Sequence, residues 1–295
     1  MSQGRPSDRR LYLLLLLVVT LWSFNYVVGK VALRQFPPLL LVGLRTALAG
    51  ILMVPVYLWR EPGKTSPWSW RELRILVPLG VCGVAANQFL FVVGLARTSV
   101  AHAGIVIATT PILVLLLAAA MGQERLSAQK LAGMGIAFAG IILLQLARAP
   151  GSPATLAGDG YVLLAAFSFA GFTVLGKSVS SRHGGITVNA IAYGSGGLLL
   201  LPLVLWQGSS FQYSGVTALG WWSVFYMAAF SSVIAYLMYY YALTHIAASR
   251  VSGFSYLQPV LATLMAIPIL REPVSPGMLV GGSLALAGVF VTERS

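Results

Sequence analysis

The sequence of 295 residues contains a long internal repeat, and both copies are hydrophobic. The stretch from Gly94 to Leu143 aligns with Ala242 to Val291 at a constant shift and without gaps. A second, shorter match nearer the N-terminus pairs Lys30 with Lys177, and each lies near the end of an apolar run. A duplicated membrane bundle is typical of secondary transporters, because two related halves leave a site between them. The landmark pairs are Pro111 with Pro259, Glu124 with Glu272, Ser127 with Ser275, Gly133 with Gly281, Ala137 with Ala285 and Gly140 with Gly288.

The composition assigns most of the surface to lipid. Hydrophobic residues make up 58% of the chain and charged residues 9%, and the mean hydropathy is +0.84. These polar groups are too few to cover the surface of a soluble protein. The lipid bilayer is therefore a predicted partner. The formal charge of +12 suggests nucleic acid as a ligand, but Lys and Arg fall in short clusters between apolar runs, as membrane topology requires. We therefore predict an integral membrane protein that binds no nucleic acid.

Charged residues and Pro or Gly breaks divide the chain at intervals of about 20 apolar residues, which is the length that a helix needs to cross the hydrocarbon layer. We predict an all-α membrane protein with ten transmembrane helices. A first five-helix repeat occupies residues 1–147, a linker occupies 148–157, and a second five-helix repeat occupies 158–292. The predicted spans are approximately 11–32, 38–59, 73–95, 101–121, 127–147, 158–180, 186–206, 219–243, 250–270 and 275–292.

The distribution of basic residues predicts the orientation of the chain. Most Lys and Arg residues lie in the loops that share a side with the N-terminus. Basic loops stay in the cytoplasm, so both termini are predicted to be cytoplasmic. Five is an odd number of spans, so the second repeat must enter the membrane upside down relative to the first. Inverted repeats predict a central cavity near the midplane that opens to the two sides in turn, which is alternating access.

Polar and aromatic side chains inside the spans are the candidates for this cavity. Such groups are costly in hydrocarbon unless they face protein, water or substrate. Trp22, Asn25 and Tyr26 recur at helical spacing, and Asn87 and Gln88 lie midway along the third span. The alternative for each residue alone is helix packing or anchoring at the membrane interface. The predicted substrate-binding residues are Trp22, Asn25, Tyr26, Asn87, Gln88, Phe169, Thr173, Ser232, Tyr236, Tyr240, Tyr256 and Gln258.

The carboxylates limit the chemistry of the cavity. Every Asp and Glu lies at a span end or in a loop, and none lies inside a span. A pump coupled to protons or sodium, or an exporter of cations, would need an acid in its pathway. The sequence instead suits a small solute with a carboxylate and an apolar or aromatic body. The carboxylates are Asp8, Glu61, Glu72, Glu124, Asp159, Glu272 and Glu293.

Three cations and two prolines have further candidate roles. Lys30 and Lys177 stand at span ends, where they can contact an anion or extend to water, and the second reading is favoured. Arg45 lies inside the second span, so it is either an anion contact or a donor to neighbouring carbonyls. Pro111 and Pro259 remove backbone donors and free the carbonyls four residues earlier. The resulting kinks are candidate hinges for alternating access, with a static bend as the equal alternative.

Motifs of catalysis do not occur in this sequence. It has no His, Cys, Asp and Glu cluster with metal-ligand spacing, no nucleophile elbow and no Gly-rich loop for phosphate. We therefore predict that the chain is not an enzyme and that it uses no cofactor and no metal. A membrane enzyme that acts on lipid and a purely structural scaffold are the less favoured alternatives from other classes.

Several motifs resemble the EamA type of the drug/metabolite transporter superfamily over nearly the whole chain. The resemblance rests on the run Trp22 to Asn25, on Leu44-Arg45, and on a Pro, Glu, Gly pattern that occurs in both halves. It implies ten spans in two repeats, and the YddG-type exporters of aromatic amino acids are the nearest group. That group implies export from a bacterial cytoplasm through the inner membrane. Tyr193 stands where the repeat partner of Arg45 would be, so a symmetric role for the arginine is not expected.

Together these observations predict a membrane transporter that exports amino acids, preferably aromatic or bulky apolar ones, and related small metabolites. Aromatic rings in the spans would supply stacking and apolar contact. Facilitated movement down a substrate gradient is the preferred energetics, with a proton-coupled antiporter of the same solutes as the fallback. The other alternative is an exporter of drugs or quaternary ammonium ions, for which aromatic faces would bind the cation. The sequence predicts no oligomeric state.

Overall fold

The computed structural model describes residues 6–60, 69–98, 100–146, 155–270 and 276–293, and every regular element assigned within these ranges is helical. Most of the predicted linker 148–157 lies outside the described residues, as do Glu272 and Ser275. The chain is an all-α membrane protein.

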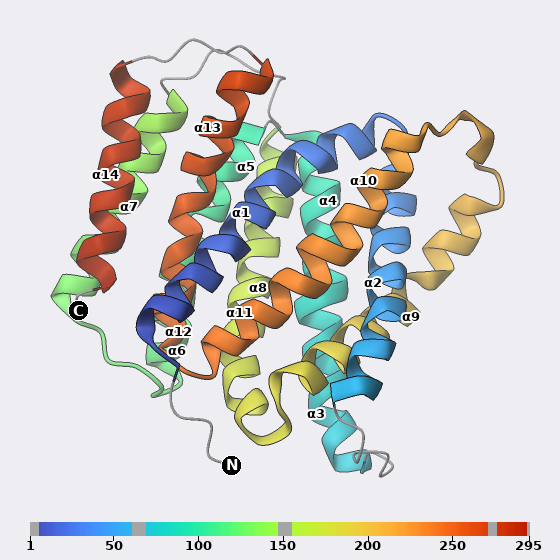
Figure 1. Cartoon of the computed structure of the whole chain (residues 1–295), viewed down its shortest axis with the longest axis horizontal. Coiled ribbons are helices and arrows are strands. Elements are labelled where there is room, and N and C mark those ends of the chain that lie inside the picture. The colour runs from blue at the N-terminus through green and yellow to red at the C-terminus, as the bar shows by residue number, and fades with distance from the viewer. Residues whose placement is uncertain (1–5, 61–68, 99, 147–154, 271–275, 294–295) are drawn as a thin grey trace.

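In the described part of the chain, consecutive helices join into about ten columns that run up and down across the molecule (Figure 1). The start of α1 and the end of α14 lie toward the same lower side in this view. The columns are α1 (Asp8–Leu33), α2 (Pro38–Arg60), α3 (Trp70–Gly80) with η1 (Val81–Ala86) and α4 (Asn87–Arg97), α5 (Val100–Ile107) with α6 (Thr110–Ala120), α7 (Ala128–Leu146), α8 (Leu156–His183), α9 (Gly185–Gly208), α10 (Ala218–Ala228) with η3 (Ala229–Ile234) and α11 (Ala235–Leu243), α12 (Ala248–Gly253) with η4 (Phe254–Tyr256) and α13 (Leu257–Leu270), and α14 (Pro276–Glu293). A short 3-10 turn, η2 (Tyr213–Gly215), precedes α10.

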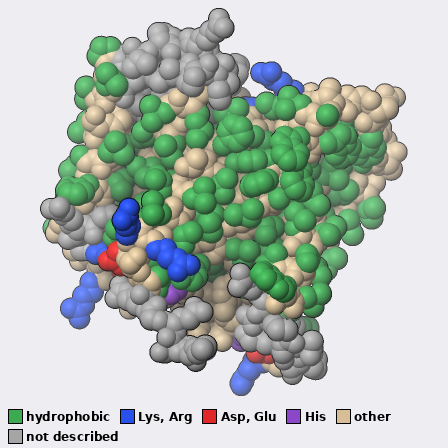
Figure 2. Space-filling view, in the orientation of Figure 1, with side chains coloured by type: hydrophobic (Ala, Val, Ile, Leu, Met, Phe, Trp, Pro, Cys, Tyr) green, Lys and Arg blue, Asp and Glu red, His purple; other side chains and the backbone are tan. Residues whose placement is uncertain are grey.

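Seven helical stretches of the described residues are long and apolar enough to cross a membrane. Figure 2 shows a broad hydrophobic face, with the visible Lys, Arg, Asp and Glu side chains gathered near its upper and lower margins. Large apolar side chains such as Leu13, Ile51, Leu164 and Leu198 are exposed on the outside of the molecule. This distribution is the one that lipid requires. The three further spans of the predicted ten, at 127–147, 250–270 and 275–292, remain a prediction.

The boundaries of the helices follow local sequence signals. Ser69 caps α3 in a capping box, in which its side chain accepts from the Glu72 amide and Glu72 accepts from the Ser69 amide. Thr155 and Thr217 cap α8 and α10 by accepting from backbone N–H groups three residues later. Pro38 stands at the first position of α2, where its missing donor costs nothing.

Two helical columns contain a π-helix, at positions that are equivalent in the repeat. The shift that aligns Gly94 with Ala242 also carries η1 onto η3. The sequence predicted transmembrane helices over 73–95 and 219–243 and gave no indication of these π-helices. A π-turn is wider than an α-turn and changes which carbonyls are free to accept other donors, and such turns are frequent at functional sites. Side chains from other helices use these carbonyls: Trp22 donates to Ser231 O, at 2.9 Å, and Ser168 donates to Cys82 O.

The two halves interlock instead of forming separate bodies. From the first half, α1 packs mainly against α10, α11 and α13 of the second half. From the second half, α8 packs mainly against α4, α5 and α6 of the first half. The equivalent helices α2 and α9 pack against each other, and so do α7 and α14. In Figure 1, α1 and α8 run in opposite directions.

The α7–α14 contact shows how the halves are related. A Cβ on Gly288 would lie 2.5 Å from the carbonyl oxygen of Gly133, and a Cβ on Gly140 would lie 2.7 Å from that of Gly281. The contacts therefore pair 133 with 288 and 140 with 281, so the helices are antiparallel. Gly281 is the repeat equivalent of Gly133, and Gly288 that of Gly140. Reciprocal contacts of this kind are what a two-fold axis produces. The prediction that these small residues serve close helix packing is confirmed.

Candidate functional site

A pocket lies where helices from both halves meet, with an empty volume of about 570 Å³ that is partly open to solvent. Its lining comes from α1, α2, α4, α5 and α6 of the first half and from α8, η3, α11, η4 and α13 of the second half. The lining residues are Trp22, Asn25, Tyr26, Arg45, Asn87, Gln88, Phe91, Ile107, Thr110, Phe169, Ser231, Tyr236, Ser255 and Gln258.

Most of the residues predicted from the sequence meet in this pocket. Trp22, Asn25 and Tyr26 line it together with five predicted residues from other spans, namely Asn87, Gln88, Phe169, Tyr236 and Gln258. Four predicted residues do not line it. Thr173 lies within hydrogen-bond distance of Tyr239 Oη, at 3.2 Å, and Tyr240 donates to Phe172 O, at 2.9 Å. The other two are Ser232 and Tyr256, which are buried outside the lining.

Five lining residues are absent from the predicted binding residues: Phe91, Ile107, Thr110, Ser231 and Ser255. Phe91 lies on the same face of its helix as Asn87 and Gln88, so helical spacing was a usable signal. Thr110 gave no signal that separates it from a packing residue. Ile107 and Ser255 are the residues whose carbonyls the two prolines free, and they are equivalent in the repeat. The proline positions therefore marked the cavity wall as well as the kinks.

Aromatic rings form one wall of the pocket. The ring of Trp22 lies 5.6 Å from that of Phe169, 5.5 Å from Tyr236 and 5.3 Å from Tyr239, with edge-on or tilted geometry. Aromatic pairs in these arrangements attract beyond their apolar burial. The bond from Trp22 Nε1 to Ser231 O fixes the indole orientation. The wall is therefore held in place before any ligand arrives.

Repeat equivalents meet at the pocket. Trp22 and Phe169 are equivalent at the shift that pairs Lys30 with Lys177, and their rings are in contact. Gln88 and Tyr236 are equivalent at the shift of the longer repeat, and Gln88 Nε2 donates to Tyr236 Oη at 3.4 Å. Contacts between equivalent residues place a pseudo-two-fold axis through or near the pocket.

Arg45 is the one cation among the lining residues, and its side chain is only 2% exposed. Its Nη2 donates to Met227 O, at 3.3 Å, and to Ser232 Oγ, at 3.1 Å. Its Nε and Nη1 are buried without a hydrogen-bond partner. No carboxylate lines the pocket, so the described residues there provide no counter-ion.

The pocket amides differ in what they bind. Asn87 donates from Nδ2 to Ala165 O, at 2.8 Å, and so ties α4 to α8. Gln88 is used in the contact with Tyr236. Asn25 is 6% exposed, and its Oδ1 is buried with no hydrogen-bond partner. The pocket thus contains unused donors on Arg45 and an unused acceptor on Asn25.

The two columns that contain the candidate hinge prolines, Pro111 and Pro259, are both interrupted. The helix of Pro111 breaks between α5 and α6, and the helix of Pro259 passes through the 3-10 turn η4. Proline has no N–H, so it cannot donate to the carbonyl four residues earlier. Discontinuous helices at a midplane site are a feature of many transporter folds. The kinks that the sequence predicted are present, and their use as hinges remains a prediction.

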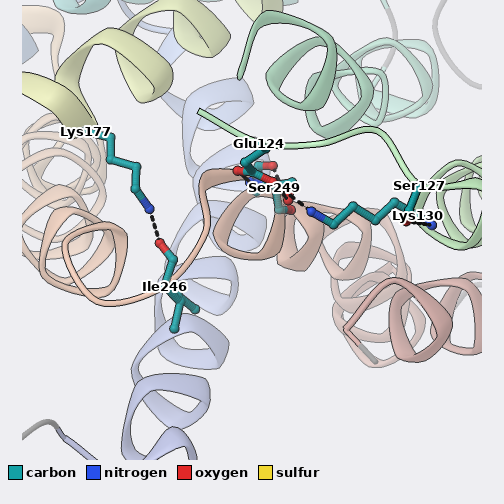
Figure 3. A network of polar contacts seen from close by, with 7 residues as sticks. Glu124, Ser127, Lys130, Lys177, Ile246 and Ser249 are labelled. Atoms are coloured by element: carbon teal, nitrogen blue, oxygen red, sulfur yellow. Dashed lines mark hydrogen bonds and ion pairs between the residues drawn. The ribbon is translucent and has the colours of Figure 1, made fainter. Parts of the chain in front are cut away.

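Lys30 and Lys177 do not line the pocket. Lys30 Nζ donates to Leu95 O, at 2.6 Å, and to Thr98 O, at 2.9 Å. Lys177 Nζ donates to Ile246 O, which is the repeat equivalent of Thr98 O (Figure 3). Each lysine therefore holds the end of a helical column through backbone carbonyls.

Glu124 joins the two halves on the side of Lys177. Its Oε1 accepts from the backbone N–H of Ser249, at 3.0 Å, and its Oε2 accepts from the Ser249 hydroxyl and from Lys130 Nζ, the last at 3.0 Å (Figure 3). Burial alone would raise the pKa of Glu124, but the bonds from Ser249 and Lys130 outweigh it and leave the pKa below its usual value. The ionised carboxylate therefore stabilises this contact between the loop after α6 and the start of α12.

The family profile of EamA-like transporters matches residues 9–146 and again residues 156–294. The chain belongs to the EamA-like transporter family. The chain is therefore a multi-pass membrane transporter and not an enzyme. In the described ranges, no group of three His, Cys, Asp or Glu side chains is placed to hold a metal.

Similar proteins support the membership of this chain in the EamA-like family. An uncharacterized transporter of Archaeoglobus fulgidus is 30% identical, and the match covers 97% of this chain and 98% of that protein. A probable terminal-alkyne amino-acid exporter of Streptantibioticus cattleyicolor is 28% identical, over 95% of this chain and 92% of its own. A probable amino-acid metabolite efflux pump of Salmonella typhimurium is 27% identical, over 94% and 93%. One crystal structure shares the fold with a TM-score of 0.78 at 21% identity, covering 98% of both chains.

Proposed function

We propose that this EamA-like protein exports amino acids with aromatic or bulky apolar side chains, and related small metabolites. The observation that carries the proposal is the aromatic pocket between the two halves, whose lining contains Trp22, Phe169 and Tyr236 together with a buried arginine. Two relatives whose names refer to amino-acid export add support.

The proposed mechanism is alternating access between inverted halves, residues 1–147 and 158–292. The reciprocal α7–α14 contacts and the interrupted columns at Pro111 and Pro259 support it. In this mechanism the halves rock about the pseudo-two-fold axis, and the pocket opens to one side of the membrane at a time. We propose that both termini are cytoplasmic and that the membrane is the bacterial inner membrane.

The proposed energetics is facilitated movement down the substrate gradient. The pocket lining contains no Asp, Glu, His or Lys that would exchange a proton in the course of transport. A proton-coupled antiporter would need such a group. Collapse of the proton gradient is therefore expected to leave substrate counterflow unchanged, and loss of counterflow would establish coupling instead.

The test of the function is counterflow in proteoliposomes that hold the purified full chain. Vesicles loaded with unlabelled L-phenylalanine are expected to accumulate external labelled L-phenylalanine, and empty vesicles are not. Trp22→Ala is expected to lower this uptake at least about tenfold, because it removes ring contacts with three aromatic neighbours. Trp206→Ala is the matched control, since Trp206 is 67% exposed on α9 and lies outside the pocket.

Two results would contradict the proposal. Absence of counterflow with every amino acid offered, in vesicles shown to contain folded protein, would reject amino acids as substrates. Accumulation of quaternary ammonium ions in preference to amino acids would favour an exporter of cations. A positively charged Arg45 in the lining makes that second result unexpected, because it repels a cation.

A further inference from the structure

The strongest unexplained feature of the pocket is the incomplete bonding of Arg45. A guanidinium has five N–H donors, and the two bonds of Arg45 both come from Nη2. Nε and Nη1 therefore hold three donors that are buried and unused. Leaving a buried charge without its partners costs several kcal/mol, so this arrangement is expected to persist only if something binds there.

The surroundings of Arg45 do not supply the missing charge. None of the described carboxylates lies in the lining. Tyr193 is the repeat equivalent of Arg45, so the pseudo-symmetry places a neutral ring where a second arginine would stand. The pocket is consequently positive on one side only.

An acceptor without a partner lies in the same pocket. Asn25 Oδ1 is buried and makes no hydrogen bond, and it belongs to α1, whereas Arg45 belongs to α2. The carbonyl side of Asn25 can accept from an ammonium but not from a carboxylate. The aromatic wall formed by Trp22 and its neighbours lines the same pocket.

We infer that Arg45 is the binding site for the carboxylate of the substrate and that Asn25 Oδ1 accepts from its ammonium group. A carboxylate matches the guanidinium in charge and geometry, and charge-assisted bonds of this kind are about twice as strong as neutral ones. The inference rests on the proposed function and adds to it, because it names the two groups that a substrate must carry. It predicts selection for zwitterions over amines with the same ring.

The test compares three probes that share one aromatic ring. L-phenylalanine has both charges, 3-phenylpropionate has only the carboxylate, and 2-phenylethylamine has only the ammonium. Binding is measured by thermal stabilisation of the purified full chain, and transport by inhibition of L-phenylalanine counterflow. With the wild-type protein, 2-phenylethylamine is expected to bind at least about tenfold more weakly than L-phenylalanine, and 3-phenylpropionate is expected to bind more tightly than the amine.

Variants assign this preference to the two residues. Arg45→Gln is expected to weaken the binding of L-phenylalanine at least about tenfold and to leave the binding of 2-phenylethylamine unchanged or tighter. Arg45→Lys is expected to keep part of the preference for L-phenylalanine. Asn25→Asp is expected to shift the preference toward the amine. Lys30→Gln is the control, because Lys30 is a partly buried cation that binds carbonyls outside the pocket. Its ratio of amine to amino-acid affinity is expected to equal that of the wild type.

The outcomes separate this inference from the proposed function. Equal binding of 2-phenylethylamine and L-phenylalanine by the wild type would overturn the inference, and this comparison stands even if Arg45→Gln does not fold. An unchanged affinity ratio in a folded Arg45→Gln would also overturn it, because Arg45 would then only join α2 to η3. Binding of 3-phenylpropionate that depends on Arg45, without counterflow of any amino acid, would support the anion site and reject the proposed function.

Discussion

The packing of α7 against α14 gives the sharpest quantitative prediction. Gly288→Ala would place a Cβ 2.3 Å from Ala137 N and 2.5 Å from Gly133 O. These are backbone atoms, so no side-chain rotation relieves the overlap. The helices must separate by about 1 Å, a gap that forfeits roughly a quarter to a half of the dispersion energy between facing atoms. Overpacking of this kind costs about 1–3 kcal/mol.

The same helix contains the matched control. A Cβ on Gly282 would have only Val260 Cγ1 near it, at 4.0 Å. Gly282→Ala therefore meets no obstacle and gains about 0.5–1 kcal/mol, because alanine loses less conformational entropy in a helix than glycine. The two alanine variants are expected to change the free energy of unfolding in opposite directions and to differ in it by about 1.5–4 kcal/mol. Gly140→Ala, whose Cβ would lie 2.5 Å from Ala285 N, is expected to behave like Gly288→Ala.

The assay is equilibrium unfolding of the purified chain in mixed micelles, followed by tryptophan fluorescence. A Gly288→Ala protein that is as stable as Gly282→Ala would refute the close α7–α14 contact. Destabilisation by Gly288→Ala but not by Gly140→Ala would refute the reciprocal, two-fold character of that contact. Neither result depends on the identity of the substrate.

Three further predictions concern polar contacts. Trp22→Phe retains the ring wall but leaves Ser231 O without its donor, so unfolding measurements should show a loss of about 1–2 kcal/mol. The pKa of Glu124 is lowered in the folded protein, so its carboxylate contributes to stability above the usual pKa of 4.5. This contribution is lost as the pH falls through the pKa of the folded state. The difference in stability between the wild type and Glu124→Gln should therefore shrink in acid titrations. Lys30→Met and Lys177→Met should both destabilise the protein in the same unfolding assay, because each removes a bond to one of the equivalent carbonyls of Thr98 and Ile246. An effect confined to one variant would contradict this equivalence.

Much of the fold could be read from the sequence because membrane spans are local features. The length of an apolar run and the position of Pro38 or Thr155 determine where a helix begins, whatever it later packs against. The repeat likewise predicted that Trp22 and Phe169 occupy related positions. Helical spacing also predicted which side chains lie on the same face of a helix. Eight of the predicted binding residues accordingly line one pocket.

The sequence by itself determined that the chain is helical, lies in lipid and consists of two related halves. Only the tertiary structure decided which equivalents meet, where the π-helices form, and that Lys177 binds a carbonyl while Arg45 keeps unused donors. The physical reason is range: burial of apolar length is decided within one segment, whereas the partners of a buried polar group come from helices far apart in the sequence. A residue such as Thr110 therefore had no local signal, and its place in the pocket follows from the packing of both halves.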